Sequence, residues 1–390
     1  MAGNSSLQSA KIDPNDEYYT QYSDIEAEMN AYVEYNPDVF RDKTILLPCD
    51  DPEWSEFTRY FAQNFEKFGI KKLISTSYAK SSGSKQLTIF ELESPNYDAE
   101  KHDTHGKLFT LTRDKDGSGN IDLDDVEFNG YLEGDGDFRS PEVTALRDQC
   151  DIIVTNPPFS LFRDFINWIM EANKSFIILG NPNAIIDIDV FPLIRDNIIW
   201  LGNKPWSKEM YFKVPEERQK WFLENKKEGS AYVIVNGEVL GRTSSIWFTN
   251  IELEKHHRQV TLDTMAHNLK YNKKLRKRFE TELGKIEYTH YVNYDAIDVP
   301  FIECIPSDYD GDMGVPVTFM DIYNPEQFEI VGFADGNLGK AIGVGCDETI
   351  FKKYYSMNKA LRRGKVFYLD VNGYPKKPFT RLIIRRKEQK

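Results

Sequence analysis

The stretch D-I-I-V-T-N-P-P-F-S-L-F, residues 151–162, joins an apolar run to a helical pattern through two consecutive prolines. Residues 151–155 are mostly apolar and β-branched, which predicts a buried strand. Residues 161–173 have the apolar spacing of a helix. The two prolines between them fix the direction of the backbone as it leaves the strand.

The residues N-P-P-F at 156–159 have a chemistry that suits one kind of ligand. Asn156 carries an amide oxygen that accepts hydrogen bonds at every working pH, and the carbonyl of Pro157 supplies a second acceptor. Two acceptors facing one point suit an amino group, and Phe159 offers a flat face for a planar ring. The alternative is a plain turn in which a proline starts the helix. The rarity of this tetrapeptide directly after an apolar strand favours a functional clamp for an aromatic amine.

Strand and helix patterns alternate around this segment. Further apolar runs lie at 44–48, 71–76 and 175–180, and residues 54–69 have helical spacing ending at a glycine. This order predicts a parallel α/β sheet, in which ligands bind at the carboxyl ends of the strands. From about residue 196 the pattern becomes that of antiparallel strands, with a V-N-G-E-V hairpin at 235–239. We expect these strands to form the antiparallel end of the same sheet.

Length and charge suggest two domains. We divide the 390 residues into 1–255 and 256–390, with an acidic insertion at about 95–135 and a linker or long helix at 253–285. The net charge of −13 argues against nucleic acid as a partner. However, three basic runs gather in the last third of the chain, at 270–279, 360–365 and 381–387. Each run alone is typical of a solvated face, but together they indicate a localised anionic partner.

Several classes of protein are disfavoured by composition. No run of about 18 apolar residues indicates a membrane span, and the polar N-terminal stretch lacks the apolar core of a secretory signal. The four cysteines are widely separated and form no metal-binding spacing. We therefore expect a cytoplasmic protein with reduced thiols and no membrane partner.

Residues 114–125, D-K-D-G-S-G-N-I-D-L-D-D, follow the pattern of a calcium-binding loop. The candidate ligands are Asp114, Asp116, Ser118, Asn120, Asp122 and Asp125. The flanking segments, however, do not have the character of a helix pair, since 106–112 has the pattern of a strand. The alternative is an acidic, glycine-rich turn between two strands. In either case we assign the loop a structural role.

The N-P-P-F segment resembles motif IV of the DNA N6-adenine methyltransferases, (D/N)PP(Y/F). Similarity extends over about 15–387 to the EcoRI-type adenine-specific methyltransferase family. It is carried by DEYYTQYSDIEAEM (16–29), PCDDPEWSEFTRYFAQNFEKFGIKKLISTSY (48–78), GDGDFRSPEV (134–143), NPPFSLFRDFI (156–166), ILGNPNAI (178–185) and GVPVTFMDIYNPEQFEIVG (314–332). The resemblance implies a Rossmann-like methyltransferase sheet and a smaller C-terminal α+β recognition domain, in the γ-like order of motifs.

The resemblance also implies roles for individual residues. Asn156 and the Pro157 carbonyl would hold the N6 amino group of a flipped-out adenine, with Pro158 fixing the turn and Phe159 stacking on the base. S-adenosylmethionine would be the methyl donor. The residues expected to bind it are Tyr19, Thr20, Pro48, Cys49, Asp50, Asp51, Thr76, Ser77, Asp137, Phe138 and Asn156.

The expected cofactor turn departs from the common glycine-rich pattern. Residues 48–52 read P-C-D-D-P, a departure that the EcoRI-type family shares. A carboxylate there could bind the ammonium group of the cofactor, or it could cap the helix that follows. The strand at 71–76 ends without the acid that often binds a ribose.

The expected partners are double-stranded DNA and a restriction endonuclease encoded nearby, and the protein is expected to act as a monomer. We assign DNA contacts to Lys273, Lys274, Arg276, Lys277, Arg362 and Arg363. Phe319 and Phe328 are expected in the core. Two alternatives stay open: the same chemistry on cytosine N4, RNA or a protein glutamine, and a DNA-binding relative without catalysis.

Overall fold

The computed structural model describes residues 19–52, 55–79, 97–345 and 347–387. The chain forms two compact units, Met1–Ala184 with Ile199–Leu253, and Ile185–Ile198 with Glu254–Lys390. The second unit therefore includes a segment that lies, in sequence, inside the first. None of the helices in the described ranges combines the length and the apolar character that crossing a membrane requires.

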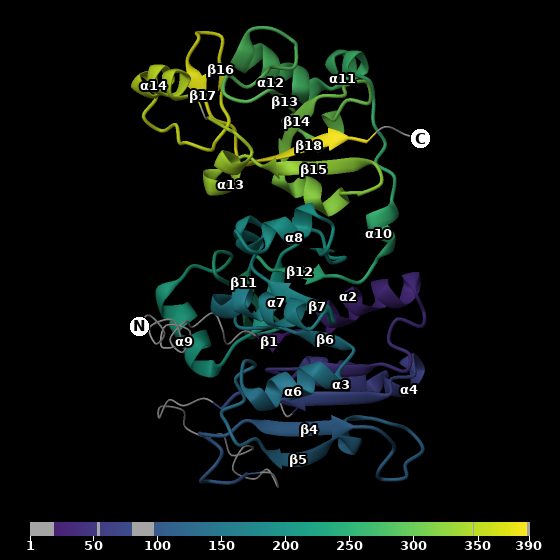
Figure 1. Cartoon of the computed structure of the whole chain (residues 1–390). Helices are drawn as coiled ribbons and strands as arrows, with labels where there is room; N and C mark the ends of the chain where they lie inside the picture. The colour runs from purple at the N-terminus through teal and green to yellow at the C-terminus, as the bar shows by residue number, and fades with distance from the viewer. Residues whose placement is uncertain (1–18, 53–54, 80–96, 346, 388–390) are drawn as a thin grey trace. The chain divides into compact units, whose positions relative to one another are not determined.

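The first unit is built on an eight-stranded mixed sheet (Figure 1). Its strands are, in spatial order, β5 (Glu127–Tyr131), β4 (Lys107–Leu111), β3 (Lys72–Thr76), β2 (Thr44–Leu47), β6 (Ile152–Thr155), β7 (Ser175–Gly180), β12 (Ile246–Thr249) and β8 (Trp200–Leu201). The four strands β3, β2, β6 and β7 are parallel to their neighbours, as the alternating pattern predicts. Chain order reverses between β2 and β6, because the strand that follows β2 in sequence lies on its other side.

Both faces of the parallel strands are buried. Ile45, Ile152 and Ile177 belong to one core cluster, while their neighbours Leu46, Ile153 and Ile178 are equally buried. Successive side chains of a strand point to opposite faces, so this burial shows that layers cover the sheet on each side. The first cluster is completed by residues of α2 (Tyr22–Tyr35), α3 (Glu56–Gln63) and α4 (Phe65–Phe68).

The helix expected over 54–69 is divided into α3 and α4. The amide of Asn64 donates to the Tyr60 carbonyl at 2.9 Å, and a side chain bonded to the backbone in this way competes with helix continuation. The expected stop at Gly69 is confirmed, since this residue ends α4 with a φ of 64°. The helices α6 (Pro141–Gln149) and α7 (Phe162–Glu171) precede and follow β6.

The expected acidic insertion is part of the main sheet, because β4 pairs antiparallel with β3 and β5 pairs antiparallel with β4. Figure 1 shows these two strands at one edge of the sheet. The expectation that all later strands continue this sheet is wrong. Only β8 and β12 do so. Strand β12 lies between β7 and β8 and therefore occupies the position beside β7 in the main sheet.

The remaining strands form a separate antiparallel sheet in the order β1 (Tyr19–Thr20), β9 (Met210–Lys213), β11 (Glu238–Thr243) and β10 (Tyr232–Val235). Its apolar residues Phe212 and Val239 join the same core cluster as the main sheet. The predicted hairpin joins β10 to β11. Asn236 and Gly237 have φ values of 52° and 85°, as a two-residue hairpin turn requires.

The second unit contains a four-stranded sheet in the order β13 (Ala296–Asp298), β14 (Asp312–Pro316), β18 (Arg381–Arg386) and β15 (Phe328–Phe333). Phe319 and Phe328 are fully buried, as expected. Arg381 of β18 donates to the Asp298 carboxylate at 2.8 Å, and both side chains are buried. This pair joins two strands that are not neighbours in the sheet.

The segment expected as a linker or one long helix is neither. It consists of α10 (Glu254–His257), α11 (Met265–Tyr271) and α12 (Lys273–Leu283). Thr264 and Asn272 cap the last two helices with their side chains. Two further helices of this unit are α13 (Gly336–Ala341) and α14 (Glu348–Met357), with α8 (Phe191–Arg195) coming from the earlier segment.

Candidate functional site

The carboxyl ends of β2 and β6 are joined by one hydroxyl group. The Thr155 hydroxyl lies 2.6 Å from the Pro48 carbonyl oxygen and 2.6 Å from the Asp50 carboxyl. Pro48 directly follows β2, and Thr155 is the last residue of β6. The segment 48–52 and the segment 156–159 therefore leave the sheet side by side, at the place where the strand order reverses.

Asp50 is the centre of this junction. Its carboxyl also accepts a hydrogen bond from the Ser55 hydroxyl at 2.9 Å, and its backbone N–H donates to the Thr76 carbonyl at 2.8 Å. Burial raises the pKa of Asp50 to about 7, against the lowering effect of the two hydroxyls. A single Thr155 proton cannot serve two acceptors, so protonated Asp50 would donate to Thr155 while Thr155 donates to Pro48. Asp50 thus supports the loop rather than facing a ligand.

Cys49 takes the backbone conformation that a glycine-rich turn would provide. Its φ is 73°, in the left-handed region that non-glycine residues rarely adopt. A non-glycine residue in this conformation carries local strain. Burial raises the pKa of the Cys49 thiol, so this cysteine is a poor nucleophile.

Asp51 forms an ion pair with a residue that sequence reasoning missed. The ammonium group of Lys107, in β4, lies 3.6 Å from the Asp51 carboxylate, and the Lys107 side chain is only 6% exposed. A lysine at an inward position of an alternating apolar strand was the signal in the sequence, because lysine is almost never fully buried without a partner. The pair places both signs of charge beside the end of β3.

Residues 134–138 and Gly106 both approach the end of β3 closely. A Cβ on Gly136, whose φ is 82°, would lie 2.2 Å from the Ser77 carbonyl oxygen, and one on Gly106 would lie 2.6 Å from it. Asp137 follows in this loop, and its carboxylate accepts bonds from Arg139 at 2.7 and 2.9 Å. Phe138 is buried against Phe165 and Trp168 in edge-on contacts, so its ring belongs to the core.

Two hydroxyls among the expected cofactor residues are buried without a hydrogen bond. Within the described part of the chain, the Oγ1 atoms of Thr20 and Thr76 have no partner. Both residues are buried, Thr76 at the end of β3 and Thr20 in β1. A buried hydroxyl without a partner is unfavourable by about 1–3 kcal/mol, so these atoms fit a site completed by a polar ligand.

The N-P-P-F segment forms an irregular turn between β6 and α7. Pro158 caps a short 3-10 turn over Phe159–Leu161, and α7 begins only at Phe162. The prolines therefore do not start the helix directly. Pro157 is buried, Asn156 is partly buried, and Phe159 packs partly against the core cluster. The Asn156 side chain and the Phe159 ring thus lie at the carboxyl edge of the sheet.

The acidic loop brings three carboxylates together. One oxygen each from Asp114, Asp116 and Asp125 lies within 4.8 Å of the others. Strands β4 and β5 flank the loop, so an EF-hand helix pair is absent from this described segment. Asp125 accepts backbone hydrogen bonds from Lys115, Asp116 and Asp122, which hold the turn closed. Calcium binding stays a prediction.

The expected DNA contacts lie on the surface of the second unit. Lys273, Lys274, Arg276 and Lys277 are exposed on α12, whose buried residues are Leu275, Phe279 and Leu283. Arg362 and Arg363 are exposed after α14, and Arg363 pairs with Glu348 at 2.6 Å. These cations are accessible to an anionic partner.

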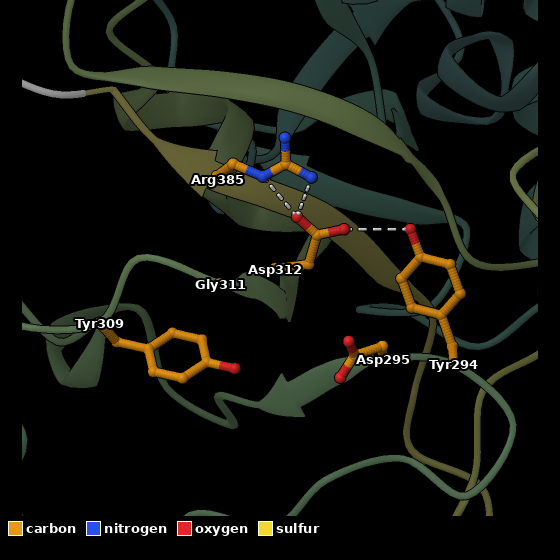
Figure 2. Close-up of a pocket in the computed structure, with 6 residues that line it drawn as sticks. All are labelled: Tyr294, Asp295, Tyr309, Gly311, Asp312 and Arg385. Carbon is orange, nitrogen blue, oxygen red and sulfur yellow. Dashed lines mark hydrogen bonds and ion pairs between the residues drawn. The ribbon is translucent and has the colours of Figure 1, made fainter.

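The third basic run, 381–387, is mainly a core strand. Leu382, Ile383 and Ile384 are fully buried in β18. Figure 2 shows a pocket of about 300 Å³ lined by Tyr294, Asp295, Tyr309, Gly311, Asp312 and Arg385. In it the Asp312 carboxylate accepts from Arg385 and from the Tyr294 hydroxyl. Arg385 is therefore neutralised within its own unit. Fewer positive charges of this run are available to an anionic partner than its composition suggests.

The chain matches known proteins over most of its length. The profile of the family described as "Adenine-specific methyltransferase EcoRI" matches residues 6–387. The Type II methyltransferase M.EcoRI of Escherichia coli is 36% identical over 335 residues, which cover 86% of this chain and 91% of that protein. The Type II methyltransferase M.MgeORF184P of Mycoplasma genitalium is 34% identical over 323 residues, 83% of this chain and 84% of that protein.

A further relative, the Type II methyltransferase M.MpnI of Mycoplasma pneumoniae, is 31% identical over 327 residues, 83% of each chain. No solved structure matches the chain. The chain belongs to the EcoRI family of adenine-specific methyltransferases.

Replacing Cys49 by glycine should stabilise the fold, because glycine adopts a φ of 73° without a Cβ penalty. We expect Cys49→Gly to raise the free energy of unfolding by about 0.5–1 kcal/mol, measured by urea denaturation. Cys49→Val, with a branched Cβ, should lower it. A glycine variant less stable than the valine variant would contradict the strain at this position.

Asp50 should make stability depend on pH. Its pKa in the folded protein, about 7, lies above the ordinary 3.8, so its contribution is complete at low pH and is lost as pH rises through about 7. Between about pH 4 and 7 we expect this group to lower the free energy of unfolding by about 3 kcal/mol. Asp50→Asn, which keeps a donor and an acceptor, should flatten this decline in urea titrations. An unchanged pH profile would exclude Asp50 as its source.

Proposed function

We propose that this chain transfers the methyl group of S-adenosylmethionine to the N6 amino group of an adenine flipped out of double-stranded DNA. Family membership supports the adenine specificity. The observation that carries the proposal is the Thr155 hydroxyl, which joins the ends of β2 and β6 where strand order reverses. Crevices at such a reversal are the usual ligand sites of parallel α/β sheets, which supports a Rossmann-like methyltransferase sheet.

In this proposal Asn156 and the Pro157 carbonyl accept hydrogen bonds from the adenine amino group. These bonds orient the nitrogen lone pair and favour the positive charge that grows on N6 during transfer. S-adenosylmethionine, when bound, supplies a methyl group on a positively charged sulfur. Asn156 and the Pro157 carbonyl would hold N6 toward that methyl group, the sulfur would leave with the bonding electrons, and N6 would afterwards lose a proton to solvent. No residue needs to act as a strong base first, and placement supplies much of the rate.

We assign the cofactor to the edge formed by the segment 48–52, the end of β3 and the loop at 134–138. The unpartnered hydroxyl of Thr76, at the end of β3, fits a polar ligand there, and we assign Thr20 of β1 to the same ligand because its hydroxyl is also buried without a partner. The Asp51–Lys107 pair offers a carboxylate and an ammonium at one place, which complements the zwitterionic amino-acid end of the cofactor. Asp50 and Phe138 would contribute by holding the two loops in shape, since their side chains are engaged within the protein.

The second unit is proposed as the DNA-recognition unit. Its exposed cations on α12 and at Arg362 and Arg363 support phosphate contacts. The similar bacterial proteins are named Type II methyltransferases. We therefore propose that the protein works with an endonuclease encoded nearby, on the same DNA sequence.

The proposal is tested by sequencing DNA from cells that produce this protein, with a method that detects modified bases. We expect N6-methyladenine within one sequence motif, and its absence at every motif would overturn the proposal. Asn156→Ala should reduce turnover at least about a hundredfold while S-adenosylmethionine and DNA still bind. Asn156→Asp, which keeps an acceptor, should retain more activity. Equal turnover of the wild type and Asn156→Ala would contradict the proposal that Asn156 holds the amino group.

The Thr76 hydroxyl gives a separate test of the cofactor site. Thr76→Val should weaken S-adenosylmethionine binding roughly fivefold to tenfold in calorimetry, since a bond to the ligand is lost. The melting temperature of the free protein should not fall, because the hydroxyl has no partner in the described structure. The matched control is Thr58→Val, whose hydroxyl lies 3.0 Å from Ser75 and is also buried. That control should lower the melting temperature and leave affinity unchanged; the reverse pattern would refute the assignment.

A further inference from the structure

Helix α14 buries none of its ten residues. Surface helices normally bury an apolar stripe, as α12 does with Leu275, Phe279 and Leu283. The Asp347 carboxylate caps helix α14 by accepting from the N–H groups of Thr349 and Ile350. Ile350, Phe351 and Tyr354 are partly buried, and Tyr354 contacts the buried Phe367 with ring centres 5.4 Å apart. This side holds the helix on its unit with little buried surface, and the other side is exposed.

The outward face of α14 carries a row of hydroxyl and ammonium groups, in which Lys352 forms an exposed ion pair with Glu348 at 3.4 Å and the Ser356 hydroxyl donates to the Lys353 carbonyl at 2.6 Å. Thr349, Lys352, Lys353 and Ser356 are all exposed. Their spacing of three, four and seven residues places them on one side of the helix. Hydroxyl and ammonium groups at this spacing can reach base edges or phosphates, but they contribute little to folding.

The surroundings of this row are basic although the protein is acidic. Residues 347–363 contain five basic and two acidic residues, in a chain with a net charge of −13. Lys353 lies over the Tyr354 ring at 5.0 Å and Lys359 over the Tyr355 ring at 4.6 Å. These contacts hold the ammonium groups at the surface while leaving them charged. The segment therefore complements a polyanion.

We propose that α14 is the sequence-reading helix of this protein, which enters the major groove of DNA with Thr349, Lys352, Lys353 and Ser356 toward the bases. This inference rests on the proposed function. The major groove admits one α-helix, and lysine and hydroxyl side chains are among the groups that read its base edges. The partly buried side of α14, with Ile350, Phe351 and Tyr354, holds the helix to the second unit, and the opposite exposed side is left for the groove.

Helix α12 would have a different task. Its apolar side is anchored in the second unit, and its exposed Lys274 and Lys277 suit phosphate contacts, which are independent of sequence. Changes on α12 should weaken binding to all duplexes alike and reduce its salt dependence. Changes on α14 should instead alter the discrimination between sequences. The two helices thus provide a matched comparison within one unit.

The test uses the full-length protein and a short duplex carrying the motif that the wild type methylates in cells. For Lys352→Ala/Lys353→Ala we expect at least about a tenfold lower kcat/KM on this duplex. Thr349→Val/Ser356→Ala, which changes no charge, should accept altered motifs that the wild type rejects. Lys340→Ala, an exposed lysine on α13, is the control and should behave as the wild type. Melting temperature and S-adenosylmethionine affinity should stay unchanged in all variants.

The outcomes separate the inference from the proposed function. If the wild type methylates DNA but both α14 variants keep its kcat/KM and motif, the helix assignment is wrong. Equal losses on cognate and unrelated duplexes would also overturn it, because they would indicate phosphate contacts alone. If the wild type methylates no adenine, the proposed function fails. The sequence preference of DNA binding can then still be measured by competition between different duplexes. If the wild type binds all duplexes equally, the assignment of α14 as the sequence-reading helix is also wrong.

Discussion

The Thr155 hydroxyl is the constraint on which the carboxyl edge of the parallel strands depends. It bonds at 2.6 Å to the Pro48 carbonyl and to Asp50, so the last residue of one strand fixes the loop that leaves its neighbour. Asp50 extends the connection to β3 through its N–H and the Thr76 carbonyl. Three parallel strands are thereby tied at their carboxyl ends. Asn156 leaves this junction with its direction already set, which is what an amine clamp requires.

Local sequence patterns predicted the parallel strands well. Each of these strands is apolar on both faces, so its continuous apolar run can be recognised without knowing which strands lie beside it. The apolar runs at 151–155 and 175–180 became β6 and β7 within one residue. The pairing of strands that are distant in the sequence could not be predicted from these local patterns. The strands β9 to β11 are partly exposed, whereas β12 is buried throughout and pairs with both β7 and β8 in the main sheet. The sequence patterns alone did not assign these strands to two different sheets.

The residues of the candidate site also fall into two groups, those recognisable from local sequence and those whose roles depend on tertiary contacts. N-P-P-F was recognisable because its chemistry lies within four consecutive residues. Roles that depend on tertiary contacts could not be recognised in this way. Lys107 became a candidate only because the structure shows its ion pair with Asp51. The Asp50 carboxyl is hydrogen-bonded to Thr155 and Ser55. The basic runs show the same limit, because composition cannot separate the buried Arg381 and the ion-paired Arg385 of β18 from exposed cations on α12. Burial and ion pairing, rather than residue type, decide which positive charges remain available to a partner.

The position of β18 has a consequence for how the protein forms during synthesis. This strand pairs with both β14 and β15, and its Arg381 closes the buried pair with Asp298 of β13. The sheet of the second unit therefore lacks its middle strand until residues 381–386 have emerged from the ribosome. The first unit ends at residue 253, so all of its residues are made before the second unit is complete. Residues 185–198 belong to the second unit, and Phe191 packs against Phe333 of β15, so the apolar side chains of this early segment are covered only after residue 333 has been made.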